Sequence, residues 1–126
     1  MTELFLLCSL IIGHFVGDFV CQTRYMGNNK GSNVSVLLDH VFVYTCILCL
    51  FMLPFIVLHL GALGVLTLIP FFVFNFWLHF ATDYCSSKLS KYYWSKGNEY
   101  GFWCVIGADQ ALHMSALVTT GFLFFL

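Results

Sequence analysis

Charged residues are scarce in this sequence: only 9% of the 126 residues are Asp, Glu, Lys or Arg, whereas 60% are hydrophobic. A soluble domain of this length could not cover so much apolar surface with polar side chains. The formal net charge is -1 and no stripe of basic residues occurs, which argues against a nucleic-acid-binding surface. The composition therefore predicts an integral membrane protein without a nucleic-acid partner.

The sequence also lacks the short alternation of polar and apolar residues that is typical of transmembrane barrels, so helices are expected. The apolar residues instead form long runs, at about 4–22, 35–58, 65–87 and 102–125. Each run is close to the ~20 residues that a helix needs to cross a bilayer. The first run has no basic leading region and no small-residue cleavage site, so we expect it to be retained. We predict an all-α fold, a transmembrane four-helix bundle, with residues 1–126 as one integral membrane domain.

Basic residues are missing from both ends of the chain and from the connection at 59–64. All five fall within residues 23–34 or 88–101, namely Arg24, Lys30, Lys88, Lys91 and Lys96. Because cytoplasmic loops are enriched in Lys and Arg, we expect these two connections to be cytoplasmic and both termini to face the outside or periplasm. Membrane lipids are the expected partners, with self-association into a homo-oligomer as a further expectation.

Each apolar run nevertheless contains polar residues, and most of these are spaced four apart, which places them on one face of a helix. The polar residues of the runs are His14, Asp18 and Gln22 in the first run, His40 in the second, Asn75, His79 and Asp83 in the third, and Asp109, Gln110 and His113 in the fourth. Counting at about 1.5 Å per residue from the basic end of each run puts the His and Asp residues among them in one layer of the bundle.

The runs contain no Lys or Arg that could neutralise these carboxylates. An aspartate in the middle of a membrane helix costs about 2.5 to 3.5 kcal/mol, so the cluster needs compensation. Protonated carboxylates, histidinium partners and a bound divalent cation would each supply it. We favour a cation, zinc with manganese or iron as alternatives, held by His14, Asp18, His40, His79, Asp83, Asp109 and His113. A metal-free proton or ion relay and structural polar contacts between helices are the alternatives.

Several segments in order resemble a known family: "GHFVGDFVCQT", then "NK" and a histidine that opens the second run, then "HFATDY" followed by basic and aromatic residues, then "VIGADQALH". They resemble an uncharacterised family of small polytopic membrane proteins of phages and bacteria, a domain of unknown function. The resemblance covers about residues 10 to 115 and implies the inner membrane of a bacterium or of a phage's bacterial host. It implies no activity.

A looser similarity links the motifs to membrane-embedded metal-dependent hydrolases, in which His and Asp pairs on facing helices hold a metal that activates water. On this interpretation Asp18 or Asp83 accepts the proton of the water, and Gln22 or Gln110 orients water or substrate. The substrate would be lipid-like or phosphorylated. Proton or metal-ion transport through the same cluster is the main alternative. A third is a phage protein that changes the host membrane by binding a host membrane protein.

Overall fold

The computed structural model describes residues 1–126 and is all-α, which confirms the predicted fold class. A short π-helix, η1, continues the first α-helix, and a 3-10 segment, η2, precedes the fourth. In chain order the elements are α1 (Thr2–Phe15), η1 (Val16–Val20), α2 (Arg24–Asn29), α3 (Val34–His59), η2 (Ala62–Thr67), α4 (Leu68–Ser95) and α5 (Glu99–Phe125).

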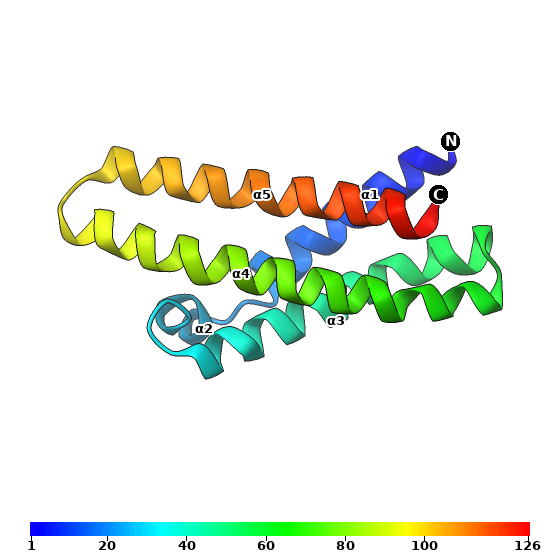
Figure 1. Cartoon of the computed structure of the whole chain (residues 1–126), viewed down its shortest axis with the longest axis horizontal. Helices are drawn as coiled ribbons and strands as arrows, with labels where there is room; N and C mark the ends of the chain where they lie inside the picture. Colours follow the sequence, from blue (N-terminus) through cyan, green and yellow to red (C-terminus); the bar gives the residue numbers. More distant parts are fainter.

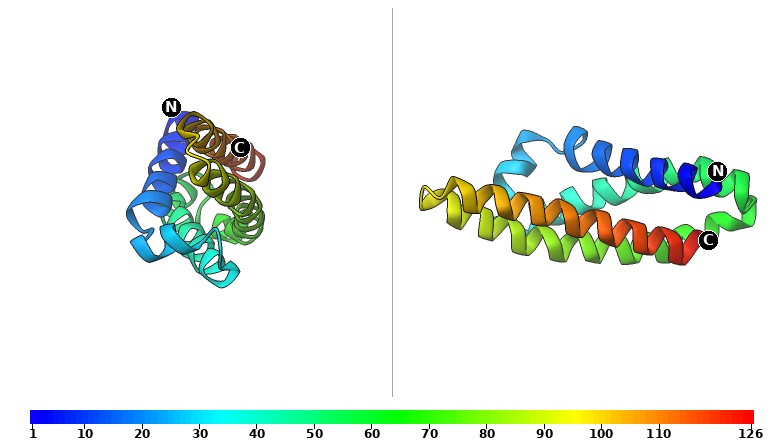
Figure 2. Two further views of the ribbon diagram at one scale, coloured as in Figure 1. Left: turned by 90° about the vertical axis from the view of Figure 1, so that its left-hand side faces the viewer. Right: turned by 90° about the horizontal axis from the view of Figure 1, so that it is seen from above.

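The four long helices α1, α3, α4 and α5 run back and forth along the same axis (Figure 1). Helices α4 and α5 pack side by side, α1 packs on α3, and α3 also packs on α4. Both termini and the connection between α3 and α4 lie at one end of the molecule, whereas α2 and the turn between α4 and α5 lie at the other (Figures 1 and 2). This alternation agrees with the up-and-down order expected from the sequence.

Three helical stretches are long and apolar enough to cross a membrane: Thr2–Val20, Val34–His59 and Ala62–Ser95. Large apolar side chains face outward, as at Leu58 and Trp77, which are 71% and 58% exposed. Helix α5 has a comparable length but is not among the three, because Asp109, Gln110 and His113 lower the mean hydropathy of its central part. The crossing of α5 therefore stays a prediction.

Two predicted boundaries were wrong. Helix α4 continues to Ser95, so residues 88–101 do not form a loop, and the short helix α2 occupies part of the predicted connection at 23–34. A drop in hydropathy along the sequence therefore does not mark the end of a helix. Helix α4 ends at Ser95, two residues before Gly97, whose positive φ of 67° is typical of the residue that follows a helix C-cap.

The first helix widens into the π-helix η1 around Asp18. Such widened turns are often found at functional sites, because they change the direction in which side chains point. Gly17 lies within this turn against α3, where an added Cβ would be 3.0 Å from Tyr44 Cδ2 and 3.1 Å from the Tyr44 carbonyl oxygen. Any larger residue at this position would therefore push against Tyr44, so glycine allows the two backbones to approach closely.

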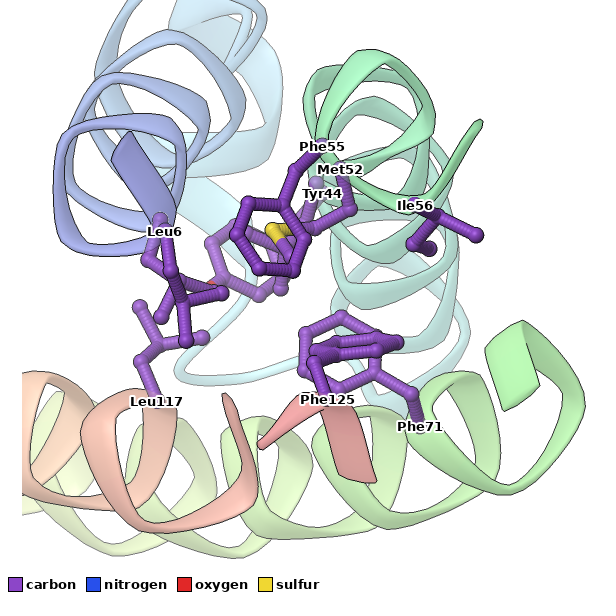
Figure 3. Packing of buried hydrophobic residues seen from close by; sticks show 10 residues of the cluster. Leu6, Tyr44, Met52, Phe55, Ile56, Phe71, Leu117 and Phe125 are labelled. Carbon is purple, nitrogen blue, oxygen red and sulfur yellow. The ribbon is translucent and has the colours of Figure 1, made fainter. Parts of the chain in front are cut away.

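The interior near the termini is mainly apolar. Figure 3 shows side chains from all four long helices meeting there, among them Leu6, Phe55 and Phe71. The complete buried cluster consists of Leu6, Leu10, Tyr44, Leu48, Met52, Phe55, Ile56, Phe71, Leu117 and Phe125. Tyr44 is at its inner edge, where the interior becomes polar.

Candidate metal centre

The predicted polar layer exists as a buried cluster inside the bundle. Its seven His and Asp side chains are only 1% to 8% exposed, and they come from every long helix and from η1. They are His14, Asp18, His40, His79, Asp83, Asp109 and His113. The seven His and Asp residues that the sequence places in one layer are thus all buried.

Four of these residues form what we call the first ligand group: Asp18 on η1, His40 on α3, and His79 and Asp83 on α4. The Nε2 atom of His40 lies 3.1 Å from Asp18 Oδ1, 3.2 Å from His79 Nε2 and 3.3 Å from Asp83 Oδ2. The Nε2 atom of His79 lies 3.4 Å from Asp83 Oδ2 and 3.7 Å from Asp18 Oδ1.

These separations match a tetrahedral ion site. Ligand atoms about 2.0 Å from a tetrahedral zinc lie about 3.3 Å from one another. Two imidazole nitrogens and two carboxylate oxygens are also a donor set that zinc accepts. Hydrogen bonding alone explains the arrangement less well, because a neutral His40 has at most one N–H at Nε2 for four polar neighbours, Lys30 Nζ included.

A second ligand group consists of Asp83, Asp109 and His113. His113 Nε2 lies 3.8 Å from Asp83 Oδ1, and His113 Nδ1 lies 3.4 Å from Asp109 Oδ2. Asp83 therefore presents Oδ2 to the first ligand group and Oδ1 to the second. A carboxylate with this arrangement can bridge two ions.

Hydrogen bonds hold two further predicted residues, His14 and Gln110, against the ligand groups. Gln110 Nε2 donates to Asp18 Oδ2 at 3.3 Å and to Asp109 Oδ2 at 3.0 Å, while its Oε1 lies 3.0 Å from His14 Nε2. An N–H at His14 Nε2 leaves Nδ1 to accept from the Tyr44 hydroxyl at 3.2 Å. Both ring nitrogens of His14 are thus engaged, so a ligand role for this residue stays a prediction.

Three residues of the site were missed. Tyr44 stacks on the His79 ring with a centroid separation of 3.8 Å, and the Ser86 hydroxyl donates to Asp109 Oδ1 at 2.5 Å. The most important is Lys30, whose Nζ lies 2.8 Å from Asp83 Oδ2 and 3.4 Å from His40 Nε2. It reaches the cluster from the end of α2, so the expectation that the carboxylates have no lysine partner was wrong. This contact was not predicted because Lys30 lies outside the apolar runs.

Some buried nitrogens and oxygens of the site have no hydrogen-bond partner: His79 Nδ1, both ring nitrogens of His113, and Gln22 Oε1. An unpartnered buried polar group costs about 1 to 3 kcal/mol. His113 is only 3% exposed, so water on the surface cannot serve it. A metal ion bound in the second ligand group would be coordinated by one of the two His113 nitrogens. The unpartnered nitrogen is therefore consistent with a metal site.

A cavity of about 630 Å³ adjoins both ligand groups. Its inner wall includes the three carboxylates of the cluster and four further polar residues; these seven are Asp18, Asp83, Asp109, Gln22, Gln110, Lys30 and Ser86. No histidine lines it, so the carboxylates separate the imidazoles from the cavity. Predicted Gln22 therefore lies at the cavity, half-buried, and not among the ligand atoms.

Neither the curated proteins nor the solved structures gave a match to this chain. The sequence motifs that contain the residues of the buried cluster extend from His14 to His113. A family model matches residues 6–125, nearly the whole chain, and the chain therefore belongs to the family described as "Protein of unknown function (DUF3307)".

Proposed function

We propose that this protein is an integral membrane hydrolase that depends on a divalent cation, zinc being the best match. The observation that carries the proposal is the first ligand group, in which five separations between two imidazole nitrogens and two carboxylate oxygens lie between 3.1 and 3.7 Å. The bridging arrangement of Asp83 supports a second ion held with Asp109 and His113.

Hydrolysis is favoured because the cluster adjoins a cavity of substrate size, about 630 Å³. A divalent cation there would polarise a phosphoryl or carbonyl oxygen and make water more acidic. Asp18 borders the cavity and accepts a hydrogen bond from Gln110, so it is placed to take the proton of the attacking water. The same carboxyl group then returns the proton to the leaving oxygen. Gln22, with its unpartnered Oε1, is placed to orient the substrate.

The apolar half of the interior counts against transport. Beyond the cluster, toward the termini, Leu48, Met52 and Phe71 are fully buried and close the centre of the bundle. A conducting path would need polar groups or water through this region. With the topology expected from the sequence, the cavity opens in the cytoplasmic leaflet. Such a position suits an enzyme that takes its substrate from one side of the membrane.

Metal content tests the proposal directly. Protein purified in detergent and measured by elemental mass spectrometry should carry stoichiometric zinc, manganese or iron. His79→Ala should lose this metal because it removes a ligand of the first group, and Asp109→Ala should lower the content by weakening the second. His59→Ala is the matched control, because His59 is the one histidine outside the cluster.

Wild-type protein that is folded, carries no metal and gains no thermal stability from added zinc or manganese would overturn the proposal. Equal metal in wild type and His79→Ala would also overturn it, since binding would then lie elsewhere. If metal is present as expected, hydrolysis of phosphate esters and acyl lipids is the assay that follows.

A further inference from the structure

The outer part of the cavity differs chemically from its inner wall. Its exposed lining residues include the aromatic side chains of Phe19 on η1 and Trp103 on α5, which are 51% and 64% exposed and which we call the aromatic rim. They also include the polar side chains of Asn28 on α2 and Lys91 on α4. A ligand that fills this volume therefore needs a polar group next to an apolar group.

Lys91 is the charged residue of this outer part. Its Nζ lies 3.3 Å from the Ser32 hydroxyl and makes no ion pair with a carboxylate. Its side chain extends along Gly31, where an added Cβ would be 3.1 Å from Lys91 Cε. Lys88, three residues earlier on the same helix, instead lies over the Tyr84 ring at 3.5 Å and does not line the cavity. The positive charge of Lys91 is thus available to an anion in the cavity.

Lys30 is the second ammonium group of the cavity, and it shares Asp83 Oδ2 with the first ligand group. A cation bound in that group competes with Lys30 for this oxygen. Lys30 is 16% exposed at its side chain and extends from the end of α2, a helix without buried residues. It can therefore turn from Asp83 toward the cavity when a cation takes its place.

The charge of the cavity depends on such a cation. With neutral histidines, the three carboxylates that line it outnumber the two ammonium groups by one, so its net charge is negative. One divalent cation makes the net charge positive. An anion is repelled in the first state and attracted in the second.

From these observations we propose that the cavity binds a phosphate ester, with Lys91 and the released Lys30 as the phosphate-binding residues and the aromatic rim in contact with an acyl chain. Lysine ammonium groups are common partners of phosphate, and Trp side chains suit the membrane interface. The phosphate belongs to a membrane lipid or to a soluble ester. The dependence on a cation rests on the proposed function, whereas the role of Lys91 does not.

Fluorescence titration tests this inference, because two of the three tryptophans, Trp94 and Trp103, line the cavity. The probes are dioctanoyl phosphatidic acid, glycerol 3-phosphate and dioctanoylglycerol, added to the purified protein in a non-ionic detergent with zinc or with a chelator. With zinc, phosphatidic acid should bind, and Lys91→Met should weaken binding about 10- to 100-fold. Lys88→Met is the matched control and should bind as wild type does, and Lys91→Arg should retain most of the binding.

The outcomes separate the sources of the phosphate and the two proposals. Phosphatidic acid binding tighter than glycerol 3-phosphate supports a lipid, and equal binding supports a soluble ester. Binding that needs Lys91 but is the same with zinc and with chelator supports the phosphate site while the metal centre fails. Equal binding of phosphatidic acid and dioctanoylglycerol, or equal losses in Lys91→Met and Lys88→Met, would overturn the phosphate site.

Discussion

The two halves of the bundle interior are built by the same helices but have opposite chemistry. On α1 the inward residues pass from Leu6 and Leu10 to His14, and on α4 they pass from Phe71 to His79. The same change occurs on α5, from Leu117 to His113. On these three helices the inward-facing stripe therefore changes from mainly apolar residues near the termini to polar residues at the ligand groups.

This contrast separates what holds the helices together from what the protein does with them. Apolar packing in a membrane gains little from leaving lipid and depends on close contact between side chains. Buried carboxylates and imidazoles cost free energy unless they are paired or bind an ion. We infer that the apolar half sets the packing of the bundle, while the polar half is kept for its chemistry.

The largest change in stability is expected in the apolar half. Phe71 is fully buried, and Phe71→Ala should lower the free energy of unfolding by about 2 to 3 kcal/mol, somewhat less than in a soluble core because lipid is also apolar. Metal content should stay at the wild-type level. Denaturation in mixed micelles measures the free energy of unfolding, and elemental analysis measures the metal content. Phe74→Ala is the control, because Phe74 is 53% exposed on the same helix. Loss of metal without loss of stability would contradict the division into halves.

A smaller change, which should affect both stability and metal binding, is expected where the apolar and polar halves of the interior meet. Gly17→Ala would place a methyl group against Tyr44, which stacks on His79. We expect a loss of about 1 to 2 kcal/mol from overpacking and a metal affinity about tenfold weaker. Zinc competition with a chromogenic chelator measures the affinity.

Gly107→Ala is the control for that prediction, because no atom lies within 4 Å of an added Cβ. Alanine in a helix interior is about 0.5 to 1 kcal/mol more favourable than glycine, so this variant should be slightly more stable than wild type. If both glycine variants change stability in the same direction, the contact with Tyr44 has no special role.

The smallest effect is expected at the polar pair between α4 and α5 on the apolar side of the cluster. Asn75 Nδ2 donates to Thr120 Oγ1 at 3.0 Å, and both residues are buried. Asn75→Ala and Thr120→Val should each cost about 1 kcal/mol and leave metal content unchanged. The double variant should cost less than the sum of the two, because each single change removes the same hydrogen bond. Full additivity in unfolding experiments would show that the pair is not coupled.

Hydropathy and helical spacing predicted the long helices and the members of the buried cluster, but not all of its partners. The four-residue spacing of His79 and Asp83, and of Asp109 and His113, was sufficient because both pairs lie on regular α-helices. Lys30 is 53 residues from Asp83 in the sequence, and no periodic pattern connects a residue outside the apolar runs to one inside them. The continuation of α4 to Ser95 was not predicted for a related reason, since the length of a helix does not depend on the thickness of a membrane.

By itself, the sequence determined that the chain is helical, that it belongs with membrane proteins by composition, and which faces of its helices are polar. These properties follow from local periodicity and from the free energy of transferring side chains out of water. Only the tertiary structure decided which atoms meet: that Asp83 faces both ligand groups, that Lys30 pairs with it, and that η1 brings Asp18 to His40. Contacts between distant residues depend on how helices pack and rotate against one another, and that packing is a property of the whole bundle.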